Sequence, residues 1–126
     1  MEEEKATPAT GSRPRLAVSH TSFVLNGKHT FLSGVNQPWL SYGADFGNNQ
    51  TNGAYCTLRE TLKNITSNGG NSIRFWLFVE GDSIPEYGSD GKVVGTDKAG
   101  SLVRDVVHYV RTAAEHNVLV FFCLWN

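Results

Sequence analysis

The run Val118-Leu119-Val120-Phe121-Phe122-Cys123-Leu124-Trp125 decides the fold class, because its apolar residues follow one another without a polar interruption. A strand without alternating polarity is typical of a parallel sheet, in which both faces of the strand are covered. We therefore predict a parallel strand at residues 118–125 that is buried on both faces.

A helix is predicted immediately before that strand. Asp97 or Ser101 is placed to cap its start, and Asn117 is placed to end it. Its apolar residues recur at helical spacing and are Leu102, Val103, Val106, Val110 and Ala113. We expect this stripe to face the sheet.

A second helix and strand lie upstream. The capping box at residues 57–60 predicts the helix start, and Asn68-Gly69-Gly70 predicts its end. Residues 71–78 read as a strand whose two faces differ in polarity. The predicted buried positions are Leu58, Leu62 and Ile65 on the helix and Ile73, Phe75 and Leu77 on the strand.

The first ordered element is a hairpin. Residues 23–25 and 28–31 read as short strands, and Asn26-Gly27 between them suits a type I′ turn. Residues 32–36 continue as a strand that Pro38 stops. Long loops are predicted at 39–53 and 79–96. The order hairpin, strand, helix, strand, helix, strand indicates an α/β fold.

Composition limits the classes of protein that fit. The chain has 126 residues, a formal charge of -1 and 40% hydrophobic residues, as expected of one globular domain without a basic field for nucleic acid. No apolar run approaches the roughly 18 residues of a membrane span.

Residues 1–21 are predicted to be disordered, and they lack the apolar core of a signal peptide. Cys56 and Cys123 do not define a redox compartment.

Arg74 is the most informative single residue, because it interrupts an apolar strand near its carboxyl end. A guanidinium buried there without a partner costs several kcal/mol, so a carboxylate is expected nearby. One interpretation is a structural ion pair. The other is a functional site, since α/β folds build their sites at the carboxyl ends of parallel strands.

Aromatic residues follow the same strand ends. They are Trp39 and Tyr42 after the first strand, Trp76 on the second and Trp125 on the third. Flat rings beside amides such as Asn36, Gln37 and Asn126 suit a sugar, whose C–H faces are apolar and whose hydroxyls seek polar groups. Each tryptophan taken alone is equally well explained as a core residue.

Other polar groups carry weaker hypotheses. Glu80, Asp82 and Glu86 lack the ligand spacing of a calcium loop and read as a solvated acidic segment. The histidines match no zinc motif, so we expect neither a metal nor a cofactor. The glycosylation sequons at Asn49 and Asn64 matter only in a secreted chain.

Three segments resemble the first barrel strands of β-mannanases in glycoside hydrolase family five, closest to the animal, mollusc-like branch. These segments are Gly34–Trp39, Asn71–Trp76 and Leu124–Asn126. The resemblance implies an incomplete (β/α)8 TIM barrel at residues 22–126, with the N-terminal hairpin, three strands and two helices. It further implies retaining hydrolysis of internal β-1,4-mannosidic bonds in a mannan-type polysaccharide.

The resemblance also implies residue roles. Arg74 matches the arginine that hydrogen-bonds the nucleophilic glutamate. Asn36, Trp39, Trp76 and Trp125 match positions that line the sugar cleft, and Asn126 is expected to join them. An extracellular, monomeric enzyme is implied for the complete form.

The chain departs from the family pattern in its carboxylates. A retaining enzyme needs two carboxyl groups about 5 Å apart, and no glutamate here follows an asparagine as the family's acid/base does. A barrel of this type needs about 250 residues. We therefore expect an inactive N-terminal fragment.

A non-catalytic carbohydrate-binding remnant is the alternative, and a nucleotide-binding module ranks last because no glycine-rich phosphate loop follows a strand.

Overall fold

The computed structural model describes residues 15–50 and 54–125. The chain divides into two compact units, residues 1–31 and 32–126.

The first unit contains a three-stranded antiparallel sheet in the order β1-β2-β3. Its strands are β1 (Leu16–Ser19), β2 (Ser22–Leu25) and β3 (Lys28–Thr30). Asn26 and Gly27 have φ angles of 51° and 81°, as the predicted type I′ turn requires, so the hairpin is confirmed.

The predicted disorder of residues 1–21 is wrong for β1. This strand, Leu-Ala-Val-Ser, is mostly apolar and pairs with β2 from Leu16 opposite Leu25 to Ser19 opposite Ser22, so its backbone groups gain ladder partners. The side chain of Asn26 also accepts a hydrogen bond from the Arg15 amide at 2.9 Å. Residues 1–14 lie outside the described residues.

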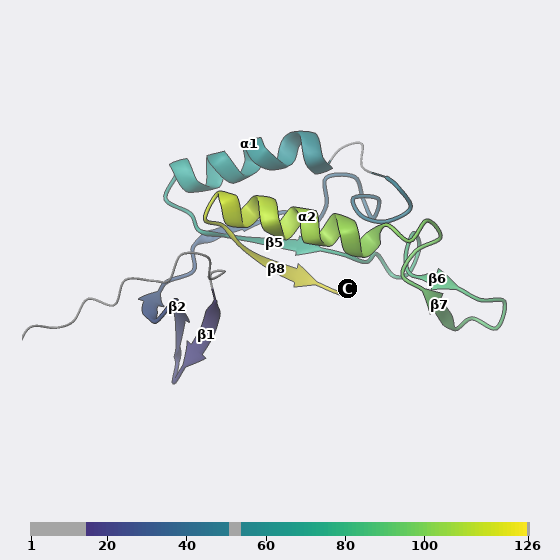
Figure 1. The fold of residues 1–126 in the computed structure, drawn as a ribbon, viewed down its shortest axis with the longest axis horizontal. Coiled ribbons are helices and arrows are strands. Elements are labelled where there is room, and N and C mark those ends of the chain that lie inside the picture. Colours follow the sequence, from purple (N-terminus) through teal and green to yellow (C-terminus); the bar gives the residue numbers. More distant parts are fainter. Residues whose placement is uncertain (1–14, 51–53, 126) are drawn as a thin grey trace, which may run out of the picture. The chain divides into compact units, whose positions relative to one another are not determined.

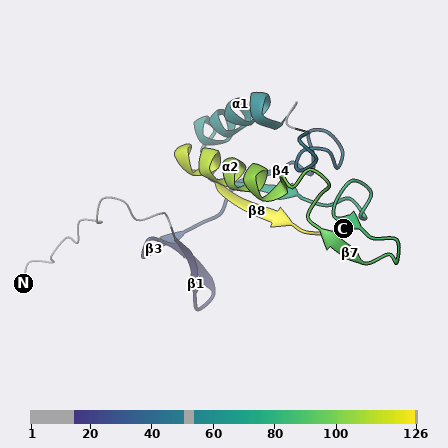
Figure 2. The ribbon, with the colours of Figure 1, turned by 45° about the vertical axis from the view of Figure 1, so that its right-hand side comes forward.

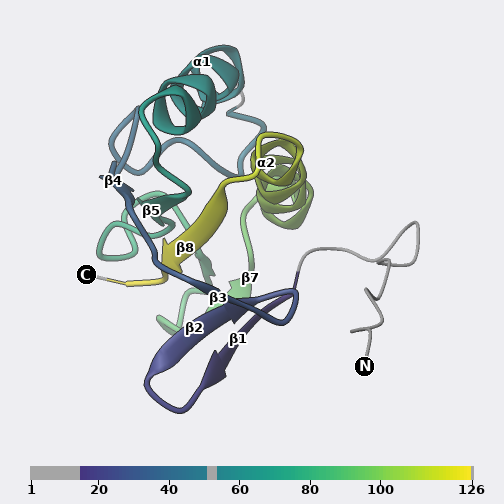
Figure 3. The same cartoon turned by 90° about the vertical axis from the view of Figure 1, so that its left-hand side faces the viewer.

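The second unit is built on a parallel sheet in the order β4-β5-β8. Its strands are β4 (Gly34–Asn36), β5 (Ser72–Trp76) and β8 (Leu119–Cys123). Helices α1 (Ala54–Ser67) and α2 (Leu102–Glu115) connect them. Both helices lie on the same side of β5 and β8 (Figure 1), and the two turned views agree (Figures 2 and 3). The predicted alternation of strands and helices is confirmed.

Register divides the side chains of this sheet between two faces. The helix-covered face carries Val35, Ile73, Phe75, Val120 and Phe122, and Ile73 and Phe75 are fully buried in the core. The core also contains the predicted Leu58, Leu62, Ile65 and Leu77. The helix-free face carries Gly34, Asn36, Ser72, Arg74, Trp76, Leu119, Phe121 and Cys123. The alternation predicted for residues 71–78 is confirmed.

The prediction that residues 118–125 are buried on both faces is wrong. All residues of β8 are half-buried, and Leu124 and Trp125 beyond its end are 61% and 51% exposed. The reason is that α1 and α2 cover one face only, while β8 pairs on one side with β5.

Helix α1 begins earlier than its capping box predicts. It starts at Ala54, so Thr57 lies inside the helix and does not cap it. Neither Tyr55 nor Cys56 is a helix breaker, which explains the extension. The predicted end is confirmed: Gly69 has φ 80°, and Gly70 donates to the Ile65 carbonyl at 2.8 Å.

The buried face of helix α2 coincides in part with its predicted apolar stripe. Val103 is 62% exposed and Val110 is also exposed, whereas Tyr109 is fully buried. The buried residues of the helix are Leu102, Asp105, Tyr109, Thr112 and Ala113. The predicted stripe is therefore confirmed at Leu102 and Ala113, with Val106 packed against the core, and is wrong at Val103 and Val110. The buried face also includes the polar residues Asp105 and Thr112, which an apolar pattern does not reveal.

The predicted loop at 79–96 contains a short antiparallel hairpin. Its strands are β6 (Glu86–Tyr87) and β7 (Val93–Gly95), and it lies at the end of the sheet where β5 and β8 finish (Figure 1). Gly91, with φ 76°, provides the reversal between them.

Candidate functional site

Arg74 lies at the centre of the helix-free face. It stands opposite Asn36 in the parallel register, so both side chains project from the same face. The guanidinium Nη1 donates to Asn36 Oδ1 at 2.9 Å, and Cζ lies 4.9 Å from the centre of the Trp76 ring. The predicted burial of Arg74 is wrong, since its side chain is exposed. Among residues 15–50 and 54–125 it forms no ion pair.

Two tryptophans meet beside this arginine. The backbone after β4 continues along β5, where Gln37 donates to the Arg74 carbonyl at 3.0 Å and Trp76 donates to that of Pro38 at 2.9 Å. This pairing brings the Trp39 and Trp76 rings to 5.1 Å between centroids. Tyr42 lies edge-on to Trp39 at 4.8 Å. The predicted gathering of these three aromatics is confirmed.

The indole N–H groups of Trp39 and Trp76 are buried and have no hydrogen-bond partner within the described part of the chain. Buried indole nitrogens normally find an acceptor. These two nitrogens are enclosed by the protein and are not presented to a ligand; the groups that the cluster presents are its ring faces and the exposed Asn36 and Arg74.

Trp125 lies apart from that pair. Its ring contacts Phe78 at 5.8 Å, and half of the residue is exposed. Asn126, the last predicted site residue, lies outside the described residues. The structure therefore brings together Asn36, Arg74, Trp39 and Trp76.

Buried aspartates hold the segment that follows Trp39. This segment is part of the predicted loop at 39–53. Asp45 accepts hydrogen bonds from the amides of Leu40 and Ser41 at 2.9 and 3.0 Å. Burial raises the pKa of this carboxyl, and the two amides oppose that rise. Gly47 donates to Asp105 Oδ2 at 3.0 Å. The loop that follows Trp39 is therefore held in place by hydrogen bonds to buried carboxylates.

Asp97 anchors the same segment to the start of α2. It accepts from the amides of Asn48, Ser101 and Leu102 at 2.6, 3.0 and 3.0 Å. Ser101 occupies the N-cap position without a side-chain cap bond, so Asp97 supplies the carboxylate. Burial would raise the pKa of Asp97, but these hydrogen bonds outweigh it and hold the pKa well below its usual range. Of the two predicted caps, Ser101 therefore holds the N-cap position and Asp97 supplies the capping acceptor.

The acidic residues of the 79–96 segment do not approach one another as a metal site. In the described residues, no three His, Cys, Asp or Glu side chains form a group that could hold a metal ion. Glu80 and Asp82 are exposed, and Glu86 is half-buried in β6. His116 contacts the Thr112 carbonyl at 2.9 Å within its own helix.

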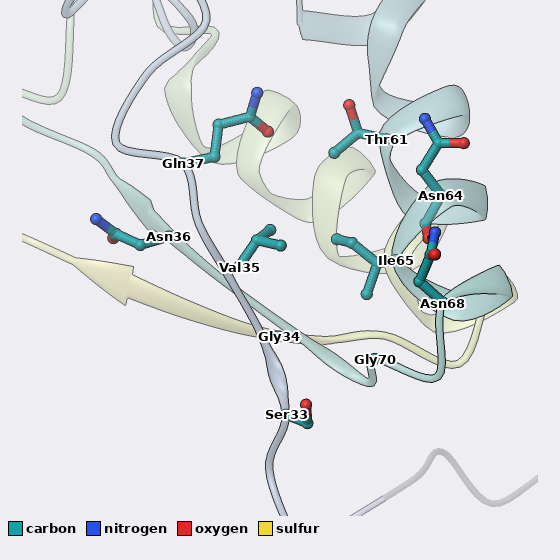
Figure 4. Close-up of a pocket in the computed structure, with 10 residues that line it drawn as sticks. All are labelled: Ser33, Gly34, Val35, Asn36, Gln37, Thr61, Asn64, Ile65, Asn68 and Gly70. Carbon is teal, nitrogen blue, oxygen red and sulfur yellow. The ribbon is translucent and has the colours of Figure 1, made fainter.

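A pocket of about 590 Å³ lies between β4 and α1 (Figure 4). Val35 and Ile65 give it an apolar floor, and the side chains of Thr61, Asn64 and Asn68 line its helical wall. Asn36 points away from α1, whereas Gln37 extends toward it. No residue pattern predicts this pocket, which borders β4, an edge strand of the β4-β5-β8 sheet in the described part of the chain.

Within residues 15–50 and 54–125, no helix combines the length and apolar character needed to cross a bilayer.

Comparison with known proteins places these features in context. No protein-family model matches the chain. A mannan endo-1,4-beta-mannosidase of Mytilus edulis is 48% identical over 118 residues, which make up 94% of this chain and 32% of that protein. A mannan endo-1,4-beta-mannosidase of Cryptopygus antarcticus is 37% identical over 121 residues, 96% of this chain and 31% of that protein.

The same likeness is found in three dimensions. The X-ray structure of the blue mussel β-mannanase matches with a TM-score of 0.83 and 46% identity, over 91% of this chain and 32% of the mussel chain. The structural neighbours are mannanases, which have a TIM-barrel fold. The chain spans about a third of the length of the curated relatives it matches. Over that third, the chain is a homologue of mollusc mannan endo-1,4-β-mannosidases.

Proposed function

We propose that this chain is the N-terminal part of a retaining endo-β-1,4-mannanase of glycoside hydrolase family five. Residues 22–126 then form the hairpin, the first three strands and the first two helices of its (β/α)8 barrel. Similarity over 94% of the chain supports this proposal, as do three parallel strands with helices on one side. An extracellular, monomeric complete enzyme acting on mannan belongs to the same proposal.

The helix-free face is the chain's share of the sugar cleft in this proposal. The observation that supports this assignment most directly is the Trp39–Trp76 ring pair beside the exposed guanidinium of Arg74. Arg74 hydrogen-bonds the nucleophilic glutamate of the complete enzyme, and the proposed sugar contacts are Asn36, Trp39, Trp76, Trp125 and Asn126. Aromatic faces pack on the C–H face of a sugar ring while amides bind its hydroxyls.

The chain by itself does not cut mannan in this proposal. Retaining hydrolysis needs an acid/base and a nucleophile about 5 Å apart. The resemblance provides no counterpart for either in this sequence. Glu80, Asp82 and Glu86 occupy the segment that leads into or forms the β6–β7 hairpin, and none follows an asparagine.

A graft tests the proposal. Residues 22–125 replace the corresponding third of the mussel mannanase, and release of reducing ends from mannan is measured for the graft and for the 126-residue chain alone. We expect hydrolysis by the graft and none by the chain. A folded graft without hydrolysis, or hydrolysis by the chain alone, contradicts the proposal.

A non-catalytic mannan-binding remnant is the second candidate. It is favoured by one observation, that Trp39, Tyr42 and Trp76 assemble entirely within this chain. It predicts that the 126-residue chain is retained on insoluble mannan, and that Trp39→Ala abolishes the retention while Val103→Ala, on the exposed side of α2, does not. Absence of retention by the unmodified, folded chain rejects this candidate.

A further inference from the structure

We propose that Asn36 and Trp76 are positioning residues for Arg74, and we call the three residues the Arg74 clamp. The inference deepens the proposed function and rests on it in one respect: Arg74 receives the nucleophilic carboxylate. It gives Asn36 a role beyond the sugar contact that the resemblance implies.

The clamp is built from strand register. Asn36 and Arg74 stand opposite each other on neighbouring parallel strands, and Trp76 follows Arg74 by two residues on the same face. The Asn36 Oδ1 atom accepts from Nη1 at 2.9 Å, while the Trp76 ring supports Cζ at 4.9 Å. The guanidinium is therefore held on one edge and one face.

The clamp leaves most of the guanidinium available. Arginine has five N–H donors, and within the described part of the chain Asn36 is the side chain that accepts from one of them. The other donors remain for a carboxylate, which binds arginine best through two parallel hydrogen bonds. Holding a long side chain before its partner arrives reduces the conformational entropy lost on contact.

An amide suits this position better than a carboxylate would. Asn36 accepts from Arg74 without neutralising it, so it does not compete with an incoming carboxylate for the same cation. Its Nδ2 group keeps two donors that the Arg74 contact does not use, and these remain for a sugar hydroxyl. An aspartate at this position would hold the arginine equally well but would occupy it as an ion pair.

The first test measures rotation of the Arg74 guanidinium about its Nε–Cζ bond by ¹⁵N NMR in the 126-residue chain, with Arg74→Lys to assign the signal. We expect Asn36→Ala to accelerate the rotation about tenfold, as loss of a hydrogen bond to a charged group implies. Asn36→Asp should keep it slow. Gln37→Ala, which removes the adjacent amide on the α1 side, should leave it unchanged. Equal rotation in Asn36→Ala and the unmodified chain overturns the clamp.

The second test uses the graft described above. Asn36→Ala should lower kcat about tenfold, beyond any rise in KM from the lost sugar contact, because the change misplaces Arg74 in the transition state. Asn36→Asp should also lower kcat, despite its slow rotation, because it competes for the arginine. A raised KM with unchanged kcat in Asn36→Ala overturns the positioning role and leaves Asn36 as a sugar contact alone. A graft without hydrolysis contradicts the proposed function, and the NMR result then decides the clamp alone.

Discussion

The two faces of β5 differ although their residues alternate along one strand. Ile73 and Phe75 are fully buried beneath the helices, whereas Arg74 and Trp76 on the helix-free face contact polar or aromatic groups and remain partly accessible. The difference shows that one short strand separates two tasks. Its inward residues hold the sheet to α1 and α2, and its other residues place a cation beside an aromatic pair.

The largest expected effect tests the packing side of this comparison. Phe75→Ala removes a ring that contacts Phe46 at 5.6 Å and Tyr109 at 5.1 Å, so it should lower the free energy of unfolding by about 3–5 kcal/mol. Phe121→Ala, on the helix-free face and half-buried, should cost about 1 kcal/mol. Urea denaturation of both variants measures the difference. Equal costs would show that the two faces are packed alike.

A smaller loss of unfolding free energy is expected at Asp97, which links the loop residue Asn48 to the start of α2. Asp97→Ala leaves the buried amides of Asn48, Ser101 and Leu102 without their acceptor and should cost about 2 kcal/mol. Asp90→Ala is the matched control, because Asp90 is an exposed aspartate in a surface pair with Lys92. Urea midpoints at neutral pH compare the two. A loss in Asp90→Ala as large as that in Asp97→Ala would reject the anchor.

The contribution of Asp97 to the free energy of unfolding also depends on pH. Because the folded pKa of Asp97 lies below the unfolded value of about 3.9, its stabilising contribution is complete above that value and is lost as pH falls through the folded pKa. The gap in unfolding free energy between the unmodified chain and Asp97→Ala should therefore be widest near pH 7 and narrower at pH 3. A gap that widens on acidification would contradict the lowered pKa.

The smallest effect concerns the outer side of α2. Val103 and Val110 are exposed, so Val103→Ser should change the unfolding free energy by no more than about 0.5 kcal/mol. Leu102→Ala, one residue away but buried, should cost about 2–5 kcal/mol. A large loss in Val103→Ser, measured by thermal or urea unfolding, would restore the apolar stripe predicted from the sequence.

Local chemistry made much of the fold predictable. Asn26-Gly27 predicts its turn because both residues accept positive φ, and Gly69 predicts the end of α1 for the same reason. Alternation at residues 71–78 correctly assigns Ile73 and Phe75 to the core. The family resemblance also identified the relatives that sequence and structure comparison find.

Other features depend on tertiary contacts that a residue pattern does not encode. The inward position of Asp105 on α2 is explained by its bond from the Gly47 amide, 58 residues away in sequence. Strand β1 depends on its pairing with β2, and its residues Leu16–Ser19 are more apolar than the charged and proline-containing residues that precede them. The exposed Arg74 was predicted to be buried, because the extent of helix cover over β5 is not visible in the strand itself.

In the proposed function, the helix-free face serves chemistry on mannan and not packing. Arg74→Ala in the graft tests it most directly, with kcat on mannan and the unfolding midpoint measured on the same preparation. We predict a loss of kcat of about 100-fold or more at an unchanged midpoint, as expected when a preorganised cation is removed from a reaction centre. A kcat within about twofold of the unmodified graft, or a loss that only follows a lowered midpoint, would contradict the claim.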